Sequence, residues 1–344
     1  MFRRDSCDYT RAMNPLEQIA ARAAREKRKI VLPEGADARV AAAAAQAAER
    51  GLAEVTVIAE GGKAEAGAAH VVDPLKNERA DAHAEALMRA RNKNQKNEMT
   101  REQALREIRA PLTLAMCMVA CGDADGCVAG AAHTTADVVR AALQIVGAKA
   151  AGDSADGLVS SFFLMLHELP HQALRGAAVF ADCAMVIDPD AAQLARIAID
   201  TADSAAALLG MKPRVALLSF STAGSARHAQ VDKVRAAGEI VAARRGDIEL
   251  LPEVQFDAAV VPEILDRKAP GMAGLAPANI FIFPDLQSAN IGYKIAERLG
   301  AVTAVGPILQ GLARPVNDLS RGCRAEDIVS LVAVTALQAQ ALSA

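Results

Sequence analysis

A polar stretch between residues 311 and 329 carries the densest set of reactive side chains in the sequence. It holds Asn317, Ser320, Arg321 and Asp327 and runs into an apolar segment that is expected to be a helix. An arginine can form paired hydrogen bonds to a phosphate, a hydroxyl can donate to an oxyanion, and a carboxylate can take a proton. A structural interpretation stays open, because Asp327 would complement the dipole of that helix and Ser320 could be a turn residue.

A second group of polar residues lies where an expected strand ends and a helix begins. Thr134 and Thr135 follow the strand, and Arg140 falls in the opening turns of the helix. Hydroxyls and free amides at a helix N-terminus suit a phosphate, and an arginine can pair with it. The alternative is a threonine cap with Asp137 complementing the helix dipole. His133 is expected to be a hydrogen-bonded loop residue rather than a ligand.

A third group, Ser219 to Ser225, directly follows another apolar strand. Ser221, Thr222 and Gly224 would let backbone amides approach an oxyanion closely. The segment lacks the Gly-Lys-Ser/Thr ending of a Walker loop. The sequence leaves an anion cradle and an ordinary turn equally open here.

Alternating strands and helices must position these groups. The expected strands are 29–32, 55–58, 127–131, 184–187, 215–220, 257–261, 280–283 and 301–305. The expected helices are 15–24, 38–49, 191–209, 231–243 and 328–342, with one or two exposed helices in 76–109 that break near 92–97. This alternation favours an α/β fold with mainly parallel sheets, in which ligands bind at the carboxyl ends of strands.

Composition limits the class of protein. The 344 residues suggest two domains of ~150 residues each, and the polar segment 149–157 is the expected seam. A hydrophobic content of 52% excludes a mainly disordered chain, and a net charge of -3 without any Trp argues against nucleic-acid binding. The apolar runs are too short to span a membrane, and no secretory signal follows Arg3 and Arg4. The six cysteines form no CxxC pair and are expected to be reduced thiols in the cytoplasm.

Six segments together resemble the phosphate acetyltransferase family, in order and spacing, from about Met13 to Gln340. They are residues 31–35 (VLPEG), 132–135 (AHTT), 180–183 (FADC), 219–222 (SFST), 281–286 (FIFPDL) and 315–322 (PVNDLSRG). The resemblance implies reversible transfer of an acetyl group between acetyl phosphate and coenzyme A. Coenzyme A would be a co-substrate, with no permanently bound cofactor and no metal, in a cytoplasmic homodimer.

The resemblance also implies an architecture. Two three-layer α/β domains, isocitrate-dehydrogenase-like, would enclose a cleft. Domain I would comprise 1–150 plus 305–344, and domain II would comprise 151–304.

Roles for individual residues follow from the same resemblance. Asp327 would be the general base, Ser320 the donor to the oxyanion and Arg321 the partner of the phosphoryl group. Since a free aspartate is a weak base for a thiol, Asp327 would have to be desolvated when the cleft closes. The further residues expected to bind substrate phosphate are Arg140, Thr134, Thr135, Ser221, Thr222 and Asn317.

Coenzyme A would meet Cys323 and either Arg89 or Arg91. The run from Arg89 to Thr100 is longer than the family pattern and has Glu98 where glycine is usual, so the choice between the two arginines stays open.

Three other functions compete with acetyl transfer. A phosphate butyryltransferase-like enzyme would differ only in its acyl pocket. A non-catalytic acetyl-CoA-sensing domain, like the C-terminal domain of hybrid malic enzymes, is disfavoured by the presence of Ser320, Arg321 and Asp327. An isocitrate-dehydrogenase-like oxidoreductase would need a cluster of metal-binding aspartates that the sequence does not display.

Overall fold

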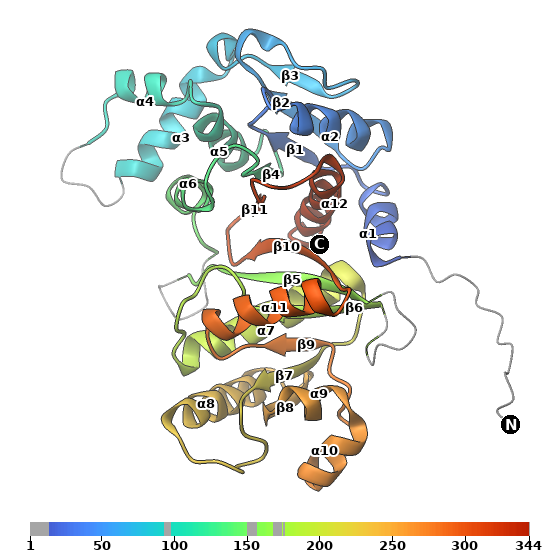
Figure 1. Cartoon of the computed structure of the whole chain (residues 1–344). Helices are drawn as coiled ribbons and strands as arrows, with labels where there is room; N and C mark the ends of the chain where they lie inside the picture. Colours follow the sequence, from blue (N-terminus) through green and yellow to red (C-terminus); the bar gives the residue numbers. More distant parts are fainter. Residues whose placement is uncertain (1–13, 93–97, 150–156, 168–173, 175, 344) are drawn as a thin grey trace, which may run out of the picture.

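The computed structural model describes residues 14–92, 98–149, 157–167, 174 and 176–343. A five-stranded sheet and a six-stranded sheet lie one above the other in Figure 1, with helices against their faces. The predicted α/β fold with mainly parallel sheets is confirmed.

The five-stranded sheet has the order β11-β4-β1-β2-β3, and its described pairings are all parallel. The strands are β1 (Lys29–Leu32), β2 (Glu54–Ile58), β3 (His70–Val72), β4 (Gly126–Ala129) and β11 (Val316–Asp318). Asp318 at the end of β11 pairs with Ala129 at the end of β4. The segments that follow β1, β4 and β11 therefore leave the sheet at one edge, where α/β proteins bind ligands.

The six-stranded sheet has the order β10-β5-β6-β9-β7-β8. The strands are β5 (Ser160–His167), β6 (Gly176–Ala181), β7 (Arg214–Leu218), β8 (Glu249–Val254), β9 (Ile280–Ile282) and β10 (Thr303–Gln310). β5 is antiparallel to both β10 and β6, while β6, β9, β7 and β8 run parallel.

The longer helices begin and end where local sequence predicts. α7 (Ala191–Leu209) starts after Asp190, whose side chain accepts from the Gln193 amide, and it ends at Gly210, which adopts a left-handed conformation. α2 (Ala38–Glu49) starts after Asp37 in the same way. The other α-helices are α1 (Pro15–Ala23), α3 (Ala80–Asn92), α4 (Arg101–Glu107), α5 (Pro111–Cys121), α6 (Thr135–Ala141), α8 (Ala229–Arg244), α9 (Phe256–Val260), α10 (Pro262–Lys268), α11 (Leu286–Leu299) and α12 (Ala325–Ala341).

One hydrophobic core joins the two sheets on one side of the molecule. It combines side chains of α1, α2 and α12 with those of α7 and α8. Two further cores are separate: α3, α4 and α5 cover the other face of the five-stranded sheet, and α9, α10 and α11 cover the other face of the six-stranded sheet. The two halves are thus packed firmly together along the α1–α12–α7 side.

Two predicted strands are wrong. Residues 184–187 form a turn after β6, because the Asp182 carboxylate accepts from the amides of Ala184, Met185 and Val186, which a strand would give to a neighbour. Residues 257–261 overlap α9, where the Ala259 amide donates to the Gln255 carbonyl in the helical pattern.

The domain division stays a prediction. Sheet membership changes after Gln310, since β10 pairs with β5 along residues 303–310, so the change lies later than the predicted boundary at 305. The expected seam at 149–157 and the expected break near 92–97 fall largely outside the described residues.

Candidate active site

A cavity of about 500 Å³ lies where loops of the two sheets face each other. The half that contains the five-stranded sheet contributes His133, Thr135, Asp318, Leu319, Ser320 and Arg321. The other half contributes Phe163, Cys183, Leu286, Asn290, Tyr293 and Pro307, together with Ala184. The cavity thus collects three predicted site residues, Thr135, Ser320 and Arg321, from segments far apart in the chain.

A larger groove, of about 990 Å³, lies at the opposite end of the five-stranded sheet. Its lining includes Lys29, Glu54 and His70, the first residues of β1, β2 and β3. We place the site in the smaller cavity because it lies at the carboxyl ends of the strands, where α/β folds bind ligands.

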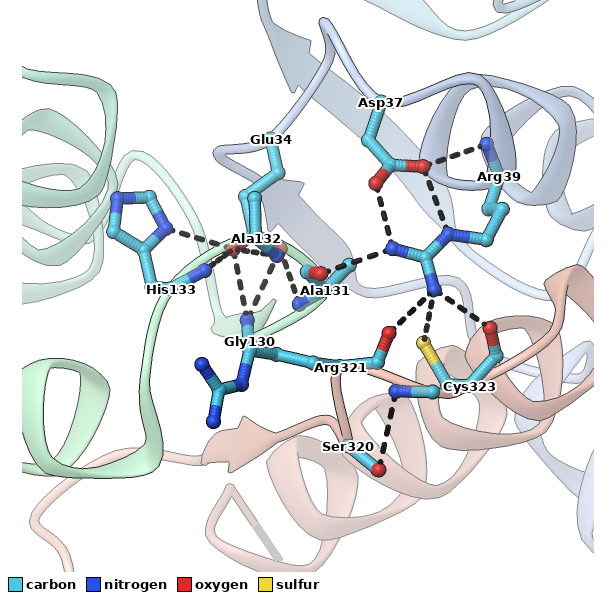
Figure 2. Close-up of polar contacts among 11 residues, drawn as sticks. Glu34, Asp37, Arg39, Gly130, Ala131, Ala132, His133, Ser320, Arg321 and Cys323 are labelled. Atoms are coloured by element: carbon cyan, nitrogen blue, oxygen red, sulfur yellow. Dashed lines mark hydrogen bonds and ion pairs between the residues drawn. The ribbon is translucent and has the colours of Figure 1, made fainter.

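Glu34 organises the loop that leads into α6. Its side chain is 2% exposed, and its carboxylate accepts from the amides of Gly130, Ala131, Ala132 and His133 at 2.8–3.1 Å (Figure 2). The His133 ring also meets it through Nδ1 at 2.7 Å. These amides look suited to an external anion in the sequence, but an internal carboxylate already occupies them.

Arg39, near the start of α2, supports two loops at once. Its guanidinium pairs with Asp37 at 2.7 Å and donates to the carbonyls of Ala131, Arg321 and Cys323 at 2.8–2.9 Å (Figure 2). The hydrogen bond from Arg39 lowers the pKa of the Asp37 carboxyl below its usual value. Arg39 thereby fixes the backbone of the 320–323 loop through its carbonyl groups.

Ser320 and Arg321 present their side chains to the cavity. Both residues are exposed. The Ser320 hydroxyl accepts from the Gly322 amide at 3.3 Å. Within the residues that the structure describes, the Arg321 guanidinium makes no hydrogen bond or ion pair, so it is available to an anion.

Asp318 brings a buried carboxyl to the same cavity. The residue is 1% exposed, and Oδ2 accepts from the Thr135 hydroxyl at 2.6 Å. Burial raises the pKa of this carboxyl to about 6, with a further contribution from the charge of Glu34. Such a group changes its protonation state close to neutral pH.

An aromatic pair forms part of the opposite wall. The rings of Phe163 and Tyr293 stack with their centroids 4.4 Å apart. Leu286 and Pro307 lie in the same lining. The cavity therefore has a polar wall with Arg321 and an apolar wall that would suit an acyl chain.

Asp327 lies outside this lining, as far as the described residues show. It is in the first turn of α12, its side chain is 50% exposed, and it accepts from the Arg324 amide at 2.8 Å as part of a capping box. The desolvation expected for a general base is therefore not present in this conformation.

Thr134 and Arg140 are also away from the cavity lining of the described chain. Thr134 caps α6, because its hydroxyl accepts from the Asp137 amide and donates to the Asp137 carboxylate. Arg140 pairs with Asp137 at 2.9 Å, and its side chain is 61% exposed. The capping interpretation of this segment is confirmed, and Thr135 alone of the two threonines reaches the cavity.

Ser221, Thr222 and Asn317 are buried and hydrogen-bonded inside the fold. Ser221 Oγ accepts from the Ala226 amide at 3.0 Å, and Thr222 Oγ1 accepts from the Gln255 amide at 3.0 Å. The Asn317 amide group connects the Leu309 amide with side chains of α12. The structure does not bring these three predicted phosphate ligands to the cavity, because their polar atoms already stabilise loops and strand contacts.

The predicted coenzyme contacts are spread out. Arg89 and Arg91 lie in the last turn of α3, and Arg91 pairs with Glu107 at 3.3 Å. Cys323 is buried beside Arg39, and burial raises the pKa of its thiol. The segment 93–97, where the sequence departs from the family pattern, lies outside the described residues.

No group of three or more His, Cys, Asp or Glu side chains among the described residues could hold a metal ion. No described helix is both long enough and apolar enough to cross a bilayer.

Comparison with known proteins decides the family. Residues 15–336 match the phosphate acetyl/butaryl transferase family. The chain belongs to this family. It is 50% identical to the phosphate acetyltransferase of Paracoccus denitrificans over 330 residues, which cover 95% of this chain and 99% of the relative.

Solved structures of this acyltransferase family are also similar to the chain. A phosphotransacetylase from Streptococcus pyogenes has 43% identity and a TM-score of 0.85, covering 96% of this chain and 98% of its own. The EutD phosphotransacetylase from Staphylococcus aureus has 38% identity and a TM-score of 0.85, covering 94% and 98%. The resemblance inferred from the six sequence segments is confirmed.

The sequence alone does not indicate a role for several residues that build the site. Glu34 and Asp318 lie inside two of the recognised segments, so their positions were marked even though their roles were not. Arg39, Phe163 and Tyr293 gave no signal, because their importance depends on contacts between distant segments.

Proposed function

We propose that the chain is a phosphate acetyltransferase, which transfers an acetyl group reversibly between acetyl phosphate and coenzyme A. The unpaired Arg321 guanidinium beside Ser320, in a cavity with one apolar wall, is the observation that carries this proposal. A guanidinium favours a phosphoryl group, and the apolar wall accommodates a methyl group.

The chemistry is direct attack by the coenzyme A thiolate on the acetyl carbonyl. Arg321 binds the phosphoryl group and favours its departure, and the Ser320 hydroxyl donates to the oxyanion that forms. A prearranged donor of this kind can lower the barrier by roughly 3 kcal/mol. Thr135 completes the polar wall.

Asp327 is proposed to take the thiol proton. A free thiol with a pKa of ~8.5 is only a few per cent ionised at neutral pH, so a base is needed. Because the Asp327 side chain is half exposed and bonded to the Arg324 amide, the role requires that a bound coenzyme covers it and displaces that bond.

Coenzyme A is a co-substrate in this proposal, and no cofactor is bound permanently. Its thiol end enters the cavity near Cys323, and its charged end extends toward Arg140 and one of Arg89 and Arg91. These arginines lie on α6 and α3, both on the same face of the five-stranded sheet. The two-domain division at 150 and 305 remains part of the proposal.

A homodimer in the cytoplasm is the proposed state. Ile291, Ile295 and Leu299 form an exposed apolar stripe on α11, with exposures of 55%, 53% and 84%, which supports a protein interface. The described cysteines are free thiols, as is usual in a reducing compartment.

The test is formation of acetyl-CoA from acetyl phosphate and coenzyme A, with butyryl phosphate assayed in parallel. The proposal expects acetyl phosphate to give the higher kcat/KM. Preference for butyryl phosphate would mean that the chain transfers a longer acyl group than acetyl. Inactivity with both substrates would contradict acyl transfer.

A further inference from the structure

Asp318 is a buried carboxyl that forms no ion pair with a cationic side chain among the described residues. Oδ2 accepts from Thr135, whereas Oδ1 is buried without any hydrogen-bond partner among the described residues. No described cation pairs with Asp318. A buried polar atom left in this way is costly, so a structural role alone does not explain it.

Glu34, which follows β1 of the same sheet, shows what a structural carboxylate looks like. It is equally buried, but both of its oxygens accept from backbone amides, and His133 adds another contact. Asp318 accepts from one hydroxyl, whereas Glu34 accepts from four backbone amides of one loop. Its ionised form is correspondingly less stabilised, so Asp318 is suited to holding a proton.

The reaction needs a proton at the phosphate end of the cavity. When the thiolate attacks, the carbon–sulfur bond forms and the carbon–oxygen bond to phosphate breaks, leaving its electron pair on the phosphate oxygen. Without a proton the departing group would be a trianion. Protonation of a leaving group by a positioned acid contributes typically 10²–10⁴-fold to a rate.

We propose that Asp318, on the cavity wall beside Ser320 and Arg321, donates its proton to the departing phosphate oxygen. The product is hydrogen phosphate, and Asp318 is left as a carboxylate. The thiol proton goes to the base, and exchange with solvent restores the proton on Asp318. In the reverse direction the Asp318 carboxylate takes the proton from hydrogen phosphate as that oxygen attacks the thioester.

The surroundings of Asp318 keep both protonation states accessible. Burial and the charge of Glu34 raise its pKa to about 6, while the hydrogen bond from the Thr135 hydroxyl acts in the opposite direction. The other titratable groups on the cavity wall are His133 before α6, Arg321 after β11, and Cys183 and Tyr293 from the opposite half. A pKa near the working pH is the condition for efficient proton transfer in both directions.

The proposal rests on the proposed acetyl transfer, and the experiment separates the two. The pH dependence of kcat/KM for acetyl phosphate is measured with saturating coenzyme A for the wild type, Asp318→Asn, Asp318→Glu and Thr135→Val. An inactive wild type would contradict the acetyl-transfer proposal itself. In an active wild type, kcat/KM is expected to fall as the pH rises through about 6, where Asp318 loses its proton.

Asp318→Asn keeps the shape of the side chain and an acceptor for Thr135 but carries no transferable proton. It is expected to lose at least about 100-fold in rate and to show no fall near pH 6. Asp318→Glu should recover part of the rate. An Asp318→Asn variant with a rate within a few-fold of the wild type and the same pH profile would overturn the proposal.

Thr135→Val decides the matter even if Asp318→Asn does not fold. It removes the hydrogen bond that favours the Asp318 carboxylate, so the fall should move to higher pH by about half to one unit. An unchanged position would overturn the proposal. Asp200→Asn is the matched control, because burial raises the pKa of Asp200 too but this residue lies in the cavity between α7 and Gln310; its substitution should leave the pH profile unchanged.

Discussion

Two hydroxyl-bearing loops follow the carboxyl ends of sheet strands in this molecule, and they differ in what their side chains do. Ser320 and Arg321, after β11, are exposed to the cavity. Ser221 and Thr222, after β7, are buried and bonded within their own half. In the sequence both segments are candidates for binding an anion, and the 311–329 stretch is the richer of the two in reactive side chains.

The difference comes from how each loop backbone is supported. Arg39 reaches across from α2 and binds carbonyl groups of the 320–323 loop, so the Arg321 guanidinium is not needed to stabilise that backbone. In the 219–226 loop the hydroxyls themselves are engaged: Ser221 accepts from the Ala226 amide, and Thr222 accepts from the Gln255 amide. In addition, the Glu253 carboxylate accepts from the Gly224 amide, just as Glu34 occupies the amides of 130–133. In this molecule, the loop whose carbonyl groups are held by an arginine from another element is the one that presents its side chains to the cavity.

Asp327→Asn should have the largest effect on catalysis. It tests what the start of α12, directly after the 320–323 loop, contributes. If Asp327 takes the thiol proton, kcat should fall by about 10²–10⁴-fold, with little change in the KM for acetyl phosphate. Steady-state kinetics with each substrate varied would measure this. Near-normal turnover would remove Asp327 as the base and would leave its capping contact with Arg324 as its role.

Arg321→Ala should have the next largest effect, because it removes the unpaired guanidinium that distinguishes the 320–323 loop from the 219–226 loop. We expect kcat/KM for acetyl phosphate to fall by about 100-fold or more, the equivalent of ~3 kcal/mol, with a small effect on coenzyme A. Arg244→Ala is the matched control, since Arg244 is an exposed arginine in the last turn of α8. Equal kinetics of the two variants would contradict the assignment of Arg321.

The sequence predicted more of the fold than of the site. Long helices with clear caps, such as α2 and α7, have their predicted limits, because their signals are local. The predicted strand 184–187 failed because the buried carboxylate of Asp182 captured its amides, which is a contact that periodicity does not report. The sequence did not predict β5 and β6, although β5 lies between β10 and β6 in the six-stranded sheet and pairs with both.

The same contrast between local signals and contacts with distant residues applies to the site. The resemblance marked the segments that contain Ser320, Arg321 and Thr135, and these meet in one cavity. It could not separate them from Ser221, Thr222 and Asn317, because exposure of a hydroxyl or an amide depends on distant partners such as Gln255 and Leu309. Arg39 could not be predicted at all, since its contacts span residues 37 to 323.

Asp318→Asn should also change stability, in the opposite direction to its effect on rate. The folded-state pKa of Asp318 is raised from about 3.8 to about 6, so folding disfavours the ionised form. The resulting penalty is fully present above about pH 6 and disappears as the pH falls below about 4. The variant should therefore gain up to about 3 kcal/mol in free energy of unfolding at pH 8 and little at pH 4.

Urea unfolding at pH 4, 6 and 8 measures this gain. A gain that does not depend on pH would mean that the burial of an ionised carboxylate is not its source. Asp200→Asn provides a comparison, because the Arg196 partner there stabilises the ionised form and would be left unpaired.

Ser221→Ala should have the smallest effect on catalysis and tests the second loop directly. The substitution removes the acceptor of the Ala226 amide and a contact with Ser225 Oγ at 3.2 Å, in a residue that is fully buried. We expect a loss of about 1–2 kcal/mol in free energy of unfolding, with kcat and the KM for acetyl phosphate nearly unchanged. A KM that rises tenfold or more without a loss of stability would return Ser221 to the substrate site. In that case the 219–226 loop would have to turn its hydroxyls toward the cavity during the reaction, and the contrast between the two loops would hold only for the conformation described here.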